Sequence, residues 1–340
     1  MSAKKTILRL LTGILVALVV VGGSIAYRMY YDRKVPNFTG EMDLYVYPGM
    51  EADHVCDSVL SSGIVKKPAS LQRVFKEVGS IKPGHYRIDA TCTSMYVSRM
   101  LHLGWQTPVN LTLSGAIRTP GVLARKIGAQ MMVDSAAVAS FAYCADSIGL
   151  DPALLFTRII PDTYQMNWTA PVKEIFARLF KERDAWWTPE RVAAAKAQDL
   201  TPEEASTLAS IVAGETNYVP EQPAIASVYL NRLRIGMKLQ ADPTVAYCFN
   251  YEPRRILRWM LEVESPYNTY KYYGLPPGPI SCPPKSCLEA VLNPDRHDYL
   301  YFCADPSFNG SHRFAVTYTE HLINARAFQK ALNERQKAAQ

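Results

Sequence analysis

The sequence predicts an α+β protein that consists of an N-terminal transmembrane helix, a small subdomain and a larger mixed α+β domain. Residues 10–26 carry no charge, residues 41–106 alternate between short strand-like and helical segments, and a longer, mainly helical stretch follows. The 340 residues, 48% of them hydrophobic, suffice for one large core or two modest ones. The expected boundaries are a tail at 1–9, a transmembrane helix at 10–27, a linker at 28–40, the small subdomain at 41–106 and the larger domain at 107–340.

The uncharged run near the N-terminus is long enough to cross a bilayer. As a helix, residues 10–26 would extend about 26 Å, close to the ~30 Å of the hydrocarbon core. Tyr27, Tyr30 and Tyr31 follow it and suit the membrane interface. The short tail before it favours a cytoplasmic N-terminus, with everything after the helix exported. A cleaved signal peptide is the alternative, because residues 24–26 (Ser-Ile-Ala) form a small-x-small pattern.

The positive charge of the chain is concentrated at the same end. The formal net charge is +6, and residues up to 34 include six basic side chains and one acidic side chain. The rest of the chain therefore has a net charge of only +1. A nucleic-acid-binding surface would need more basic residues than that, so no nucleic-acid partner is expected.

The seven cysteines are scattered and form no recognisable ligand or disulfide pattern. Because their number is odd, they cannot all pair within one chain. Cys282 and Cys287 either form a disulfide in an oxidising compartment or remain independent buried thiols. A zinc site built from these two residues and His297 would lack a fourth ligand at a recognisable spacing, so no metal or other cofactor is expected.

The elements after the linker follow from hydrophobic periodicity and turn residues. In the small subdomain, strands are expected at 44–50 and 82–88, and helices at 52–60, 70–78 and 94–103. In the larger domain, a strand is expected at 109–113, and helices at 120–127, 134–147, 172–181 and 189–198. Trp186 and Trp187 fit either a stacking platform for a ligand or a packed helix junction.

A further helix is predicted to start after Thr201 and to end near Glu215. Thr201 is a candidate N-cap, Pro202 suits the first helical position, and Glu204 completes a capping box. Counted from Leu208, apolar residues follow at three and four positions, and Glu215 falls at seven. The carboxyl group is therefore expected on the same face as the buried stripe.

Two interpretations of this carboxyl group remain open. If it is buried without a partner, desolvation raises its pKa and keeps it protonated near neutral pH, as a general acid requires. Alternatively, Glu215 reaches solvent at the helix end or pairs with Arg232 or Arg234.

Several segments between residues 208 and 280 together resemble the YceG-like endolytic murein transglycosylases, the MltG family. They are LASIV at 208–212, Glu215-Thr216, NRL at 231–233, DPTV at 242–245, YNTY at 267–270 and GLPPGPI at 274–280. The resemblance is looser from about residue 44 to the C-terminus. It implies that Glu215 corresponds to the catalytic glutamate of the family and that residues 41–106 are LysM-like, either contacting glycan or only positioning the larger domain.

The resemblance also implies the reaction. The C6 hydroxyl of muramic acid can attack C1, so that one carboxyl serves first as acid and then as base, without the second carboxylate of a hydrolase. Asp242 either stabilises oxocarbenium-like charge or caps the turn before Pro243. Candidates for substrate binding, or for buried hydrogen bonds, are Asn231, Gln240, Asp242, Thr244, Tyr267 and Asn268.

The expected protein is a single-pass inner-membrane enzyme with its catalytic domain in the periplasm. It would cleave the MurNAc-GlcNAc β-1,4 bond of nascent peptidoglycan strands, leave 1,6-anhydro-MurNAc ends and terminate elongation beside peptidoglycan synthases. The alternatives are a non-catalytic glycan-binding scaffold for these synthases and a two-carboxylate muramidase. One departure from the family is Ala213-Gly214, where many members carry an acidic residue two positions before the catalytic glutamate.

Overall fold

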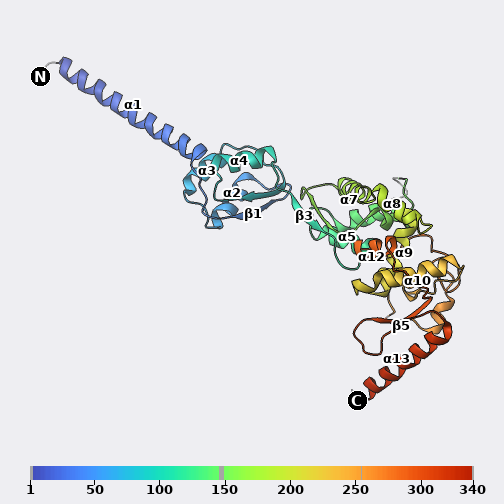
Figure 1. Cartoon of the computed structure of the whole chain (residues 1–340). Coiled ribbons are helices and arrows are strands. Elements are labelled where there is room, and N and C mark those ends of the chain that lie inside the picture. The colour runs from blue at the N-terminus through green and yellow to red at the C-terminus, as the bar shows by residue number, and fades with distance from the viewer. Residues whose placement is uncertain (1–2, 145–148, 254, 339–340) are drawn as a thin grey trace. The chain divides into compact units, whose positions relative to one another are not determined.

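The computed structural model describes residues 3–144, 149–253 and 255–338 (Figure 1). The chain forms two compact units, one of residues up to 110 with 165–170 and one of residues 111–164 with 171–340. The first contains α1 (Ala3–Lys34), β1 (Met42–Val46), α2 (Ala52–Ser61), α3 (Pro68–Phe75), β2 (Gly84–Ile88) and α4 (Ser94–Leu103). Strands β3 (Val109–Thr112) and β4 (Thr163–Met166) pair with each other where the chain passes from one unit to the other.

The second unit is mostly helical. It contains α5 (Pro120–Gly128), α6 (Ser135–Tyr143), η2 (Pro152–Arg158), α7 (Val172–Trp186), α8 (Pro189–Lys196), α9 (Pro202–Glu215), η3 (Val219–Glu221), α10 (Gln222–Arg234), α11 (Asp242–Cys248), η4 (Arg258–Glu262), α12 (Lys285–Leu292), β5 (Tyr301–Ala304), β6 (His312–Ala315) and α13 (Tyr318–Ala338). The fold class is thus mixed α+β, but the strands of the described residues form only two-stranded sheets.

In the first unit, β1 and β2 form an antiparallel pair that α2, α3 and α4 complete into a small core. Leu44 lies opposite Tyr86, and both side chains are buried. Val55 of α2, Leu71 of α3 and Val97 of α4 belong to the same hydrophobic cluster. The strands and helices expected between residues 44 and 103 are therefore confirmed, with α4 at the expected bounds.

Helix α1 continues beyond the transmembrane segment that the sequence predicts. Residues 28–34, expected to begin a linker, form its last two turns. The physical reason lies in tertiary contacts, because the Asp32 carboxylate accepts a 2.5 Å hydrogen bond from Ser70 and pairs with Arg73 at 2.7 Å. Residues 5–34 are long and apolar enough to cross a membrane, and their apolar side chains are exposed.

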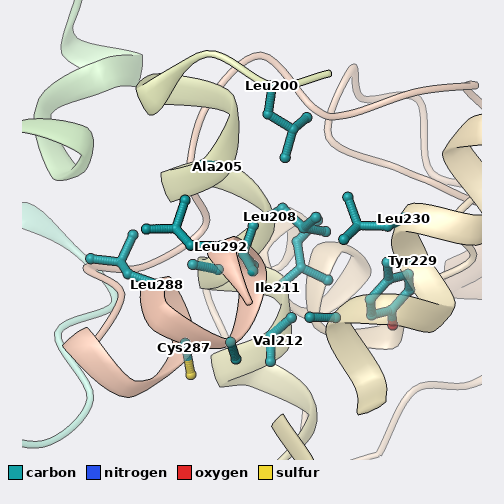
Figure 2. Close-up of a cluster of buried hydrophobic side chains, with 14 of the residues drawn as sticks. Leu200, Ala205, Leu208, Ile211, Val212, Tyr229, Leu230, Cys287, Leu288 and Leu292 are labelled. Carbon is teal, nitrogen blue, oxygen red and sulfur yellow. The ribbon is translucent and has the colours of Figure 1, made fainter. Parts of the chain in front are cut away.

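Helix α9 lies at the centre of the second unit, packed against α10, α11, α12 and η2 (Figure 2). The sequence predicts one buried face, whereas every residue from Ala205 to Val212 is buried. The polar side chains among them bond to the backbone: Ser206 to the Pro202 carbonyl at 2.8 Å and Thr207 to the Glu203 carbonyl at 2.9 Å. A helix buried on all sides is possible here because its hydroxyl groups are satisfied within the helix.

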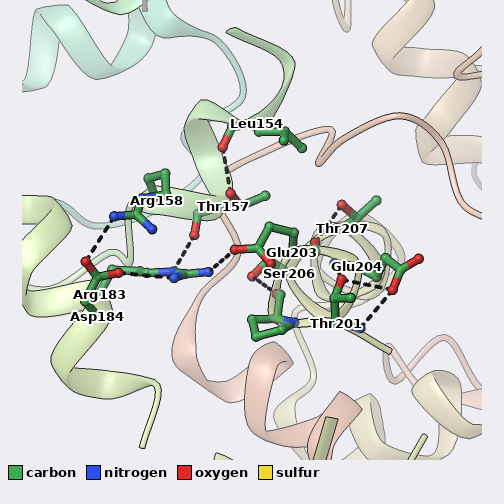
Figure 3. A network of polar contacts seen from close by, with 11 residues as sticks. Leu154, Thr157, Arg158, Arg183, Asp184, Thr201, Glu203, Glu204, Ser206 and Thr207 are labelled. Atoms are coloured by element: carbon green, nitrogen blue, oxygen red, sulfur yellow. Dashed lines mark hydrogen bonds and ion pairs between the residues drawn. The ribbon is translucent and has the colours of Figure 1, made fainter. Parts of the chain in front are cut away.

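A polar network fixes the N-terminal end of α9 (Figure 3). The expected capping box is present, with Thr201 and Glu204 bonding to each other's backbone N–H groups. The buried guanidinium of Arg183 on α7 donates to the Thr157 carbonyl at 2.9 Å and pairs with Glu203 at 2.7 Å. Helix α7, η2 and α9 are thereby joined through one side chain.

Other predicted helices agree with the structure, with α7 extending five residues beyond its expected end at 181. The last part of the helix expected at 134–147 lies outside the described residues. At the junction of α7 and α8, the rings of Trp186 and Trp187 meet edge to face at 5.2 Å, and Trp187 is buried. This pair therefore forms a packed helix junction.

We expect Leu208→Ala to destabilise the second unit by about 2–5 kcal/mol, because it removes a fully buried side chain from a cluster that cannot collapse easily. Denaturant unfolding of the full chain in detergent would measure this loss. Val192→Ala is the matched control, since that side chain is 40% exposed and its truncation should cost much less. Equal losses in both variants would contradict a central role for α9.

Candidate active site

Glu215 is the last residue of α9 and lies beside the first residues of α11. Helix α9 ends there because Thr216 has an extended conformation. A Cβ atom on Gly214 would lie 2.5 Å from the Cβ of Pro243. Only glycine permits this close approach. The contact brings Asp242, the residue before Pro243, close to Glu215.

A pocket of about 770 Å³ opens beside Glu215. Five chain segments surround it: the loop after β3, the turn at 161, the end of α9, α11 with the turn after it, and the loop before α12. Its lining residues are Gly115, Ala116, Arg118, Pro161, Ala213, Gly214, Glu215, Thr216, Asn217, Pro243, Ala246, Tyr251, Pro253, Ile280, Ser281, Cys282 and Pro284. Arg118 is the cation of this set, and its guanidinium lies 4.7 Å from the centre of the Tyr251 ring.

The carboxyl group of Glu215 is held in an environment that favours its protonated form. Burial raises its pKa to about 7, and the nearby negative charge of Asp242 acts in the same direction. Tyr229 of α10 donates a 2.5 Å hydrogen bond to Oε1, which opposes the increase in pKa, as does the charge of Arg232. Near neutral pH the group can therefore both release and accept a proton.

The two arginines that the sequence offers as ion-pair partners are engaged elsewhere. Arg232 donates to the backbone carbonyls of Leu300 and Leu239. Arg234 donates to the side chains of Asn231 and Gln198. Within the described residues, Glu215 makes no ion pair, so the structure does not support the alternative of a salt-bridged helix end.

Asp242 is the first residue of α11 and is exposed. The hydroxyl group of Tyr270 donates a 2.6 Å hydrogen bond to its Oδ1. Burial, together with this hydrogen bond, raises the pKa of Tyr270, so the phenol remains a donor at physiological pH. The site therefore contains two carboxyl groups, each oriented by a tyrosine hydroxyl.

Three of the other predicted contact residues use their polar groups inside the protein. The Asn231 amide donates to the carbonyls of His297 and Tyr299, and the buried Asn268 amide donates to those of Leu261 and Val263. The Thr244 hydroxyl is buried beside Thr269 at 2.9 Å. These bonds support structural roles, and substrate contact by these residues stays a prediction.

Gln240 and Tyr267 lie on the segments that support α11. Gln240 is exposed, has a positive φ of 47°, and its N–H donates to the Thr269 carbonyl at 3.1 Å. The half-buried ring of Tyr267 lies 4.5 Å from that of Tyr247. Substrate contact by either residue likewise stays a prediction.

The loop at 274–280 is tied to the protein at both sides. A Cβ atom on Gly278 would lie 2.2 Å from the carbonyl oxygen of Ala153, so this glycine permits a close approach to η2 rather than to a ligand. The N–H of Ile280 donates to the Ser210 hydroxyl of α9 at 2.9 Å. All seven cysteines are free, and Cys282 and Cys287 are independent buried thiols.

The sequence analysis named Glu215 and Asp242, which lie close together, but it named neither the tyrosines that bond to them nor the arginine in the pocket. Tyr229 is fourteen residues after Glu215 in an apolar helix, where nothing distinguishes it from a core residue. Tyr270 belongs to the YNTY segment, which was a usable signal. Arg118 follows the loop at 114–116 and carries no recognisable motif.

We expect two substitutions to move the pKa of Glu215 in opposite directions. Tyr229→Phe removes a hydrogen bond that favours the carboxylate and should raise the pKa above about 7, whereas Asp242→Asn removes a repelling charge and should lower it. Carbon-13 NMR of the glutamate carboxyl groups would measure both, with Glu215→Gln identifying the signal. If Glu215 titrated at the same pH in the wild type, Tyr229→Phe and Asp242→Asn, neither Tyr229 nor Asp242 would act on its carboxyl group as described.

Comparison with known proteins places this site in a family context. A Bacillus subtilis protein named endolytic murein transglycosylase is 35% identical over 178 residues, which are 52% of this chain and 49% of the relative. A Streptococcus pneumoniae protein of the same name is 23% identical over 349 residues, covering 92% of this chain and 63% of the relative. The chain thus spans between half and two-thirds of the length of these curated relatives.

The fold is similar to the crystal structure of a YceG-like protein from Listeria monocytogenes. The TM-score is 0.52 at 26% sequence identity, over 83% of this chain and 98% of that one. The YceG-like family itself matches residues 44–327, which include the whole pocket beside Glu215. The chain therefore belongs to the YceG-like family.

Proposed function

We propose that this chain is an endolytic peptidoglycan lytic transglycosylase in which Glu215 is the catalytic acid and base. The observation that carries the proposal is the Glu215 carboxyl group, which borders a pocket of about 770 Å³ and has a pKa raised to about 7. The names of the relatives support the same reaction class. The substrate would be a peptidoglycan strand, cleaved between MurNAc and GlcNAc.

In the first step, protonated Glu215 donates its proton to the glycosidic oxygen as the bond from that oxygen to C1 of muramic acid breaks. A pKa of about 7 suits this step, because a sizeable fraction of the carboxyl is protonated at neutral pH. Tyr229 holds Oε1 through its hydrogen bond, so that the other oxygen is the one available to carry the proton.

In the second step, the Glu215 carboxylate accepts the proton of the C6 hydroxyl, whose oxygen attacks C1 and closes the 1,6-anhydro ring. Water is not consumed, and the carboxyl group returns to its protonated state. Positive charge develops at C1 between the two steps, and we assign its stabilisation to the Asp242 carboxylate, which Tyr270 orients.

The pocket suits a sugar strand bearing anionic groups. Its volume is in the range of small-ligand sites, roughly 300–1,000 Å³, so it would hold only part of a strand. We assign Arg118 to the lactyl or peptide carboxylates of the muramyl residue, because its charge is exposed at the pocket wall.

A two-carboxylate hydrolase is the second candidate, and the proximity of Asp242 to Glu215 is the observation that favours it. In that case Asp242 would activate a water molecule, and the products would carry reducing ends. The hydroxyl group of Tyr270 occupies Oδ1 of Asp242, and the relatives are named as transglycosylases, so we place the lytic reaction first. A scaffold that binds glycan without cleavage would need neither a glutamate with a raised pKa nor a second carboxylate beside it.

We expect the full chain to release fragments with 1,6-anhydro-MurNAc ends from peptidoglycan, and Glu215→Gln to lower the rate at least about a thousandfold. Mass spectrometry of the digest measures both. Glu334→Gln on α13 is the control, an exposed glutamate whose loss should leave cleavage unchanged. Reducing ends would favour the hydrolase, and absence of cleavage by the wild type would favour the scaffold.

The rate of cleavage should fall as pH rises through about 7, because the first step needs protonated Glu215. In Tyr229→Phe this decline should move to higher pH, since the carboxyl then loses a hydrogen bond that stabilises its charged form. Initial rates between pH 5 and 9 would measure the shift, which a change in fold alone would not produce. A decline at the same pH in both proteins would contradict Glu215 as the acid.

We further propose that α1 anchors the enzyme in the inner membrane with both units on the periplasmic side, where it works on nascent strands beside peptidoglycan synthases and sets strand length. The exposed apolar side chains of α1 support the anchor. The helix also continues without a break from the apolar segment into the turns that pack on α3 and α4, which supports an anchor joined directly to the first unit.

We expect the chain extracted from cell membranes to keep its N-terminus and to need detergent for release. Intact mass spectrometry of the extracted chain tests this. A mature protein that begins after Ala26 would show instead that residues 1–26 are a signal peptide.

A further inference from the structure

A second hollow lies in the first unit, where α1 ends and α4 begins. Its volume is about 800 Å³, similar to that of the pocket beside Glu215. The residues around it include Arg33, Lys34, Asp89, Tyr96, Arg99 and Trp105. We call this hollow the junction groove. The proposed reaction makes no use of it.

The junction groove carries free positive charge. Arg33, Lys34 and Arg99 are exposed, and none of them makes an ion pair or a side-chain hydrogen bond with any described residue. Arg87 differs, since it pairs with Glu41. The acidic residue of the lining, Asp89, is engaged with the N–H and hydroxyl groups of Thr91 at 2.7 and 2.5 Å. Three cations therefore remain available for an anion.

The position of the groove along α1 indicates which kind of anion could reach it. Arg33 and Lys34 follow Tyr27, the last residue of the expected membrane segment, by about 9–11 Å of helix. The polar headgroup layer extends about 5–8 Å beyond the hydrocarbon, and the long basic side chains can reach back into it. This step rests on the proposed anchor.

The end of α1 is packed on the elements that form the groove. The three cations therefore stay at a fixed distance from the membrane segment. Asp32 pairs with Arg73 of α3 at 2.7 Å, and the ammonium group of Lys67 lies 3.8 Å from the centre of the Tyr31 ring. Asn37, immediately after the helix, donates to the buried Ser94 hydroxyl at 2.9 Å. The first turns outside the membrane are thereby fixed against α3 and α4.

Two exposed aromatic rings border the same groove. Tyr96 and Trp105 are 48% and 49% exposed, and their ring centres are 6.0 Å apart. Tyrosine and tryptophan favour the headgroup level of a bilayer, where one part of the ring is in an apolar medium and the other is hydrated. The groove therefore combines exposed aromatic rings, which favour the headgroup level, with three unpaired cations, which suit an anionic lipid.

We propose that the junction groove binds the phosphate of an anionic phospholipid headgroup in the leaflet from which α1 emerges. Arg33, Lys34 and Arg99 supply the charge, and Tyr96 and Trp105 contact the lipid at the interface. Because the groove belongs to the small unit, lipid binding there holds that unit against the membrane in one orientation.

Native mass spectrometry of the full chain in a neutral detergent tests this site, with phosphatidylglycerol and phosphatidylcholine as the lipid probes. We expect the first phosphatidylglycerol to bind at least about tenfold more tightly than phosphatidylcholine. Arg33→Gln/Lys34→Gln/Arg99→Gln should remove this preference. Lys76→Gln/Lys196→Gln/Arg326→Gln, which removes three exposed cations outside the groove, should retain it.

The possible results are distinct. Equal affinity for both lipids, or an unchanged preference in the groove variant, would overturn the proposal. Competition by inorganic phosphate without a preference for phosphatidylglycerol would also overturn it, because the groove would then bind free anions. Cleavage of peptidoglycan is measured on the same preparations, so a failure of the lipid site is separable from a failure of catalysis. A chain that lacks residues 1–26 in cells would refute the anchor itself.

Discussion

The arrangement of the second unit depends on the burial of α9 from Ala205 to Val212. A helix enclosed by α10, α11, α12 and η2 must satisfy its hydroxyl groups internally, and Ser206, Thr207 and Ser210 do so by bonding to the backbone one turn earlier. The last turn follows directly on this enclosed stretch, and the half-buried Glu215 lies there beside the pocket. Desolvation of that carboxyl group is therefore a consequence of how the core is built.

The site itself results from contacts between segments that are distant in the chain. The missing side chain at Gly214 lets Pro243 approach α9, and Asp242 arrives with it. Ser210, one turn before the site, accepts the N–H of Ile280 and so holds the loop that closes another side of the pocket. Tyr229 and Tyr270 then fix one oxygen of each carboxyl group. A small set of close approaches thus decides both the shape of the pocket and its charge.

The first unit has a comparable dependence on one buried polar junction. The Asp32 carboxylate at the end of α1 is buried and bonds to Ser70 and Arg73, while Asn37 bonds to Ser94. These bonds convert what would be a flexible connection into a continuous helix joined to the small core. Because this connection is rigid, the basic and aromatic residues around the junction groove stay at a fixed distance from the apolar segment of α1.

The sequence by itself determined most of the elements and the position of Glu215 at the end of α9. Capping residues and hydrophobic periodicity are local properties, so Thr201, Glu204 and the 208–212 stripe predicted α9 and placed Glu215 at its end. The family resemblance singled out the same residue. Tertiary structure decided the rest: that α1 extends through Lys34, that Tyr229 rather than an arginine contacts Glu215, and that Asn231, Thr244 and Asn268 bond within the protein. These outcomes depend on which distant groups share a buried space, and a hydrogen bond between residues fourteen or more positions apart leaves no periodic signal in the chain.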